Sequence, residues 1–125
     1  MLGDKNAIAT IAVKDVNVAK KFYEGTLGLK PEPSEGAGVL SYKSGNANVL
    51  VYKSDYAGTN KATAATWEVG DKLSNVVQEL KSKGVSFEHY NLPGLRIDGD
   101  VHTDGKMKVA WLKDPDGNIL SLVGR

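Results

Sequence analysis

The sequence contains no cysteine and only two histidines, His89 and His102. The absence of cysteine excludes disulfides, thiol nucleophiles, and zinc or iron–sulfur sites built on cysteine. Two histidines cannot supply three imidazole ligands to one metal ion. A three-histidine metal site is therefore excluded within a single chain.

The chain also lacks an excess of charge and a long apolar run. Its 16 Lys and Arg residues nearly balance its 15 Asp and Glu residues, and no basic stretch is dense enough to follow a nucleic acid backbone. No apolar stretch approaches the ~20 residues of a membrane span, and the N-terminus lacks the pattern of a signal peptide. Because 41% of the 125 residues are hydrophobic, we expect one cytoplasmic domain with a core and no nucleic acid or membrane partner.

The first half of the chain has the pattern of a strand, a helix and two strands. A strand is predicted at about 7–13, followed by a helix that Asp15 caps and Gly28 ends. Apolar residues keep to one face of this helix: Val16, Ala19, Phe22, Tyr23 and Leu27. Strands at 38–43 and 48–53 are joined by a hairpin turn, Ser44-Gly45-Asn46.

The second half repeats this order. A strand is predicted at about 64–69, then a helix that Asp71 caps and Gly84 ends. A strand at 85–89 and an irregular loop at 90–105 follow. The chain closes with two strands joined by Asp114-Pro115-Asp116-Gly117-Asn118, in which proline, the Asx side chains and glycine each favour a tight turn.

A constant offset relates the two halves. Three pairs are each 56 residues apart: Val13 and Val69, Asp15 and Asp71, and Gly28 and Gly84. The turn residues Gly45-Asn46 and Gly117-Asn118 are 72 apart, so the second half carries 16 extra residues, which we assign to the loop. A constant offset indicates an internal repeat. We therefore predict two βαβββ modules, at about 6–54 and 63–125.

Several motifs in these modules resemble the vicinal oxygen chelate superfamily, which includes glyoxalase I, bleomycin resistance proteins and extradiol dioxygenases. They are Val13-Lys14-Asp15 followed by Ala19 and Phe22-Tyr23, then Leu27-Gly28-Leu29, and the turn 114–118. The resemblance implies an α+β fold in which two βαβββ modules form cupped mixed sheets. It also implies a homodimer. Enzymes of this superfamily hold a divalent metal inside the cup.

The resemblance further implies where metal ligands would stand: a His or Gln on the first strand of each module and a Glu on the last. These positions correspond to Ile8 and Ala64 on the first strands, and to Val49 and Ser121 on the last. None of the four side chains is a credible ligand for Mg²⁺, Mn²⁺, Ni²⁺ or Zn²⁺. We therefore expect no metal and no cofactor.

Residues beside these positions are candidates for lining the cup. Alternation along a strand places Thr66 and Glu68 on the same face as Ala64, Trp67 beneath the helix, and Thr10 in the cup from the first module. In an apolar cup Glu68 would be desolvated, which would suit it to act as a general base. The alternative is that Glu68 is solvated or paired with a lysine.

The remaining candidates are aromatic residues and groups in the 90–105 loop. Tyr42, Tyr52 and Trp111 are interpreted either as core or as walls of the pocket. His102, with Arg96 and Asp98, is a candidate ligand contact because recognition groups often lie on loops. Ser121 completes the set of predicted ligand-binding residues.

Three hypotheses for the function follow. The first is a metal-independent protein that sequesters a drug-like or metabolite ligand in an apolar cup. The second is a lyase or isomerase of the glyoxalase type with Glu68 as general base. The third is a dimeric structural or regulatory module without a ligand. Function depends on the site and not on the fold, so replacing Glu68 would separate the first two.

Overall fold

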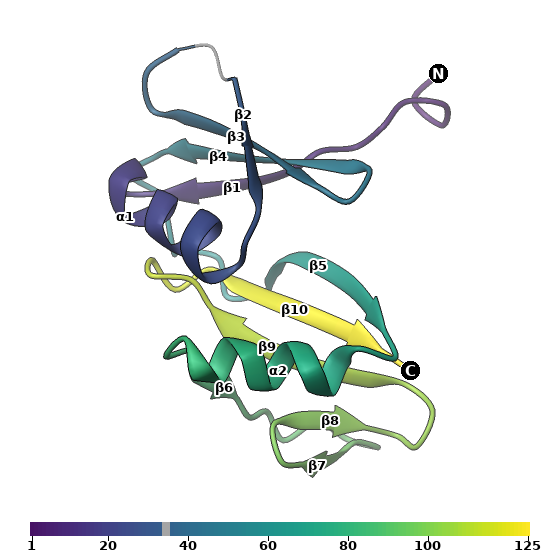
Figure 1. Ribbon diagram of the computed structural model, residues 1–125. Helices are drawn as coiled ribbons and strands as arrows, with labels where there is room; N and C mark the ends of the chain where they lie inside the picture. The colour runs from purple at the N-terminus through teal and green to yellow at the C-terminus, as the bar shows by residue number, and fades with distance from the viewer. Residues whose placement is uncertain (34–35) are drawn as a thin grey trace.

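The computed structural model describes residues 1–33 and 36–125, which form two β-sheets with one helical segment associated with each (Figure 1). The first sheet has the strand order β1-β4-β3-β2, and the second has the order β5-β10-β9-β8-β7 with β6 also paired to β9. Each sheet combines one parallel pair, β1 with β4 or β5 with β10, with antiparallel pairs. The predicted α+β fold of two βαβββ modules with mixed sheets is confirmed.

The elements follow the predicted order. The first module contains β1 (Ala9–Val13), α1 (Val16–Lys20), the π-helical segment η1 (Lys21–Thr26), β2 (Lys30–Glu32), β3 (Val39–Ser44) and β4 (Ala47–Lys53). The second contains β5 (Thr63–Gly70), α2 (Leu73–Ser82), β6 (Phe87–Glu88), β7 (Arg96–Asp98), β8 (Val101–Thr103), β9 (Lys108–Lys113) and β10 (Ile119–Gly124). None of the helices in the described parts of the chain is long and apolar enough to cross a membrane.

The helix ends show why these segments stop where they do. The Asp15 carboxylate accepts hydrogen bonds from the backbone N–H groups of Asn17 (2.8 Å) and Val18, so the predicted cap of α1 is confirmed. Gly28 adopts φ +75° after η1, and Gly84 adopts φ +92° after α2, a conformation that favours glycine. The cap predicted at Asp71 is wrong, because α2 begins after Lys72 without a side-chain cap.

The predicted irregular loop at 90–105 contains a β-hairpin. Its strands β7 and β8 pair antiparallel. Strand β8 also pairs with the first residues of β9, along the same edge at which β6 pairs with later residues of β9. The extra residues of the second module therefore widen its sheet. His102 accordingly lies in a strand and not in a loop.

The core lies between each sheet and its helices. In β1 the buried residues are Ile11 and Val13, which alternate with exposed Thr10. In β10, Leu120 and Leu122 face the helix side. Burial of these apolar faces is the main stabilising contribution to such a fold. No helix of residues 1–33 and 36–125 lies on the opposite face of either sheet (Figure 1).

The β9–β10 turn joins the two modules. The buried Asp114 carboxylate accepts a hydrogen bond from the Tyr23 hydroxyl at 2.7 Å. The Asn118 side-chain amide donates to the Ala12 carbonyl at 2.8 Å and to Asp114 at 2.7 Å. The Asp116 carboxylate accepts from the Lys14 backbone N–H at 3.3 Å. This turn, predicted only as a local reversal, therefore connects the C-terminal hairpin to β1 and η1.

Candidate functional site

The sheet face opposite the helices carries most of the predicted site residues. We call it the open face and define it by Thr10 on β1, Tyr52 on β4, Thr66 on β5, Trp111 on β9 and Ser121 on β10. Strand register places them together, because Thr66 pairs with Ser121, which in turn pairs with Trp111. In the first module Ala12, two residues after Thr10, pairs with Tyr52. The edge strands β1 and β5 belong to different sheets but lie close to each other, which brings the two parts of this face side by side.

A pair of hydroxyl groups lies at the centre of the second sheet's share of the open face. The Thr66 Oγ1 and Ser121 Oγ atoms are 2.7 Å apart, which makes them hydrogen-bond partners. Ser121 is 4% exposed. The two hydroxyls therefore form a neutral polar pair that satisfies part of its own hydrogen-bonding capacity.

An aromatic cluster borders this hydroxyl pair. The Trp111 ring makes edge-to-face contacts with His102 (4.8 Å between ring centroids) and with Tyr90 (5.3 Å). The Trp111 indole N–H donates to the Thr63 hydroxyl at 3.3 Å. Sequence reasoning missed Tyr90, because it lies just after the short strand β6 and outside any periodic pattern.

His102 is fully buried, packs edge-to-face against Trp111 and lies in β8, so its predicted position on a loop is wrong. The Tyr90 backbone N–H donates to His102 Nε2 at 2.8 Å, so in the neutral ring the proton is on Nδ1. Neither His102 Nδ1 nor the Tyr90 hydroxyl has a partner among the described residues. Arg96 and Asp98 are exposed on β7, away from this cluster.

Glu68 lies on the same face of β5 as Thr66 and is exposed. Its carboxylate has no hydrogen bond or ion pair within residues 1–33 and 36–125. The burial on which its predicted role as a general base depends is therefore absent in a single copy of the chain. The alternative of a solvated carboxylate describes its position.

Tyr42 does not lie on the open face, which corrects its prediction as a pocket residue. It is fully buried on the helix side of β3, and its ring stacks on Tyr23 with 6.4 Å between centroids. Its hydroxyl donates to the Glu24 carboxylate at 2.9 Å. Burial and this hydrogen bond raise the pKa of Tyr42. Tyr52, by contrast, is 37% exposed.

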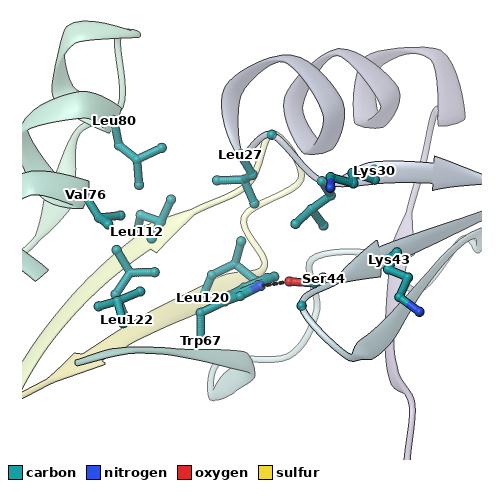
Figure 2. A pocket seen from close by; sticks show the side chains of 14 residues that line it. Leu27, Lys30, Lys43, Ser44, Trp67, Val76, Leu80, Leu112, Leu120 and Leu122 are labelled. Atoms are coloured by element: carbon teal, nitrogen blue, oxygen red, sulfur yellow. Dashed lines mark hydrogen bonds between the residues drawn. The ribbon is translucent and has the colours of Figure 1, made fainter. Parts of the chain in front are cut away.

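A cavity of about 410 Å³ lies on the other side of the second sheet, between the two modules (Figure 2). Its walls include Leu27 from the end of η1 and Leu80 from α2, with Leu120 and Trp67 from the sheet. The Trp67 indole N–H donates to the Ser44 hydroxyl at 2.9 Å across the module boundary. Alternation correctly placed Trp67 on the helix side, but no sequence pattern indicated that space remains beside it.

Comparison with known proteins identifies the family to which this chain belongs. A family model, the Glyoxalase/Bleomycin resistance protein/Dioxygenase superfamily, matches residues 6–122. The chain belongs to this superfamily. The match covers nearly the whole chain and agrees with the resemblance inferred from the motifs. No curated protein matches this chain.

Solved structures share the superfamily fold. The glyoxalase family protein from Enterococcus faecalis is 19% identical, with a TM-score of 0.73 over 98% of this chain and 99% of that one. The fosfomycin resistance protein FosX from Listeria monocytogenes is 14% identical, with a TM-score of 0.72 over 98% and 91%. A glyoxalase/bleomycin resistance protein/dioxygenase from Alicyclobacillus acidocaldarius is 19% identical, with a TM-score of 0.71 over 97% and 91%. At these identities the likeness concerns the fold alone.

The register corrects one of the positions at which the superfamily resemblance placed metal ligands. Thr10 and Thr66 are equivalent, and their parallel partners are Leu50 and Ser121, so the last-strand position in the first module is Leu50 and not Val49. The offset is 71 and not 72. The turn between β3 and β4 spans two residues but that between β9 and β10 spans five, so aligning their Gly-Asn pairs shifted the register by one.

The correction leaves the chemistry of these positions unchanged. They are occupied by Ile8, Leu50, Ala64 and Ser121, and only the serine has an oxygen in its side chain. Within residues 1–33 and 36–125, no three His, Asp or Glu side chains are grouped so that they could hold a metal ion. These residues do not fit the divalent metal that the superfamily fold implies.

Proposed function

We propose that this superfamily member is a metal-independent small-molecule binding protein that holds a drug-like or metabolite ligand against the open face. One observation carries the proposal. Ser121 occupies the position of the superfamily's carboxylate ligand, and its hydroxyl is hydrogen-bonded to the Thr66 hydroxyl at 2.7 Å. The aromatic ring of Trp111 lies on the neighbouring strand, beside Ser121. A neutral hydroxyl pair beside an aromatic surface suits binding through stacking and hydrogen bonds.

Protein purified without chelators is expected to contain well under one equivalent of metal per chain. A ligand that binds only the folded state raises the melting temperature. Because no metal is expected to bind, adding Ni²⁺, Zn²⁺, Mn²⁺ or Fe²⁺ is expected to leave the melting temperature unchanged. Mass spectrometry of metals and thermal shift measurements check both points. A near-stoichiometric metal or a clear shift with one ion would contradict the metal-independent assignment.

Ligand binding at the open face is tested with a panel that includes bleomycin and fosfomycin. A compound that binds there is expected to lose about 5- to 150-fold in affinity in Trp111→Ala, since a ring stacked on an aromatic side chain contributes about 1 to 3 kcal/mol. Binding is measured by isothermal titration calorimetry. Tyr56→Ala, at an aromatic residue that is 79% exposed, is the matched control. Equal loss in both variants would count against the open face.

We further propose that two copies of the chain associate as a homodimer through their open faces. The support is the exposure of large apolar side chains on this surface in one copy, where Ile8 is 54% and Tyr52 37% exposed. Light scattering is expected to give twice the chain mass of 13.4 kDa. Ile8→Asp should shift the mass toward one chain, whereas the same change at exposed Val18 on α1 should not. A monomer at tens of micromolar would refute this arrangement.

A further inference from the structure

The cavity between the modules is separate from the open face, although the same strands form both. Leu120 and Leu122 line the cavity, and Ser121 between them belongs to the open face. The other walls are Leu27 and Leu80, with Trp67 beneath (Figure 2). A volume of about 410 Å³ lies within the ~300–1,000 Å³ typical of small-molecule sites. The proposed function does not use this cavity.

Within the described residues, the charged side chains that line the cavity are two lysines at its border. These lysines, Lys30 and Lys43, stand opposite each other in the antiparallel register of β2 and β3. Alternation along β3 places Lys43 on the opposite face from Tyr42 and Ser44. Figure 2 shows the Lys43 side chain directed away from Trp67 and Leu120. A charged group held against Trp67 and Leu120 would therefore lose its hydration, and the Lys43 ammonium would not compensate for this loss (Figure 2).

The Ser44 hydroxyl is a polar group in the lining of the cavity. The Ser44 hydroxyl accepts the Trp67 indole N–H at 2.9 Å, and its own proton has no acceptor among the described residues. A serine hydroxyl can donate one hydrogen bond while it accepts others. The cavity thus offers this hydroxyl as a donor beside walls formed mainly by leucine, valine and tryptophan side chains.

We propose that this cavity binds an uncharged, mainly aliphatic molecule with one acceptor oxygen, such as a medium-chain ketone or lactone, and that the oxygen accepts the Ser44 hydroxyl proton. The apolar portion lies against Leu80, Leu120 and Leu122. The site is distinct from the one at which the superfamily fold implies a metal. It is therefore a second binding site on the same chain.

The first experiment compares three probes of equal chain length: nonan-2-one, nonanoate and nonylammonium. Each is titrated against the full chain carrying N-phenyl-1-naphthylamine, an uncharged fluorophore, and its displacement is followed by fluorescence. The ketone is expected to displace the fluorophore at a concentration at least tenfold lower than either ion. Equal or tighter binding of nonanoate would overturn the proposal and would point to the bordering lysines.

Ser44→Ala tests the hydrogen bond. Its affinity for nonan-2-one is expected to fall about fivefold, the effect of one neutral hydrogen bond. The matched control is Ser41→Ala, because Ser41 lies on the same strand but on its other face. Equal affinity of the Ser44 and Ser41 variants for the ketone would refute the assigned role of Ser44.

Val76→Phe tests the location. Val76 lines the cavity from α2, so a larger side chain there fills the space and is expected to abolish ketone binding. Val18→Phe, on the exposed surface of α1, should bind as the parent does. Melting temperatures establish that both variants fold, and Val69→Leu replaces Val76→Phe if the latter does not. Undiminished ketone binding in a folded variant whose cavity is filled would overturn the proposal. A compound that binds the open face should bind this variant as it binds the parent, which distinguishes the two sites.

Discussion

Replacing Asp114 with alanine is expected to lower the free energy of unfolding by about 3 to 5 kcal/mol, because a buried carboxylate with several donors is removed. The carboxylate accepts from the Tyr23 hydroxyl (2.7 Å) and from the Asn118 side chain (2.7 Å). It also accepts the backbone N–H groups of Asp116 and Asn118, each at 2.9 Å. The change leaves these donors without an acceptor inside the protein. Urea unfolding followed by circular dichroism measures the loss.

Asp104→Ala is the matched control. Asp104 also accepts two backbone N–H groups in a turn, from Lys106 and Met107, but it is exposed. Its replacement should therefore lower the unfolding free energy by about 1 kcal/mol or less. In a double-mutant cycle, Tyr23→Phe should destabilise the parent more than it destabilises Asp114→Ala. A loss at Asp114 no larger than at Asp104 would show that the turn does not hold the modules together.

Stability is expected to fall steeply at alkaline pH because two buried tyrosines resist ionisation. Burial, followed by the charge and hydrogen bond of Asp114, raises the pKa of Tyr23, and burial with the hydrogen bond to Glu24 raises that of Tyr42. Both pKa values lie above the ~10 of an unfolded tyrosine. Their contribution is complete below pH 10 and is lost as the pH rises further, at about 1.4 kcal/mol per pH unit for each tyrosine.

Urea unfolding at pH 9, 10 and 11 measures this dependence, and absorbance of tyrosinate counts the groups that ionise in the folded state. Tyr23→Phe with Tyr42→Phe should flatten the loss of stability above pH 10. Tyr56→Phe should not, because Tyr56 is 79% exposed. Burial also raises the pKa of Tyr90, which leaves a smaller dependence in the double variant. Ionisation of all five tyrosines near pH 10 without unfolding would contradict the expectation.

Much of the fold could be predicted because it rests on local patterns. Alternation in β1 and β5, the Asp15 cap and the glycines at 28 and 84 are each readable within a few residues. The prediction of a cap at Asp71 was wrong, because the repeat offset identified the residue equivalent to Asp15 but not the backbone geometry at the start of α2. The hairpin β7–β8 was missed because its strands are only three residues long, which is too short to show a clear periodicity.

The candidate site could be predicted less completely, because it depends on register and on contacts between distant segments. The one-residue difference between Val49 and Leu50 follows from turn length, which the paired Gly-Asn residues obscured. Tyr42 was not assigned to a face, although its pairing with buried Val49 places it in the core. The cavity beside Trp67 depends on how two modules pack, which no single segment encodes.

The turn between β9 and β10 also bears on the order in which the chain can fold. Its bonds to Ala12, Lys14 and Tyr23 join groups 91 to 106 residues apart. A chain emerging from the ribosome can form β1 and its helix early, but these hydrogen-bond partners are made only 91 to 106 residues later. Such long sequence separations slow folding. The first module is therefore completed only when synthesis of the second has nearly ended.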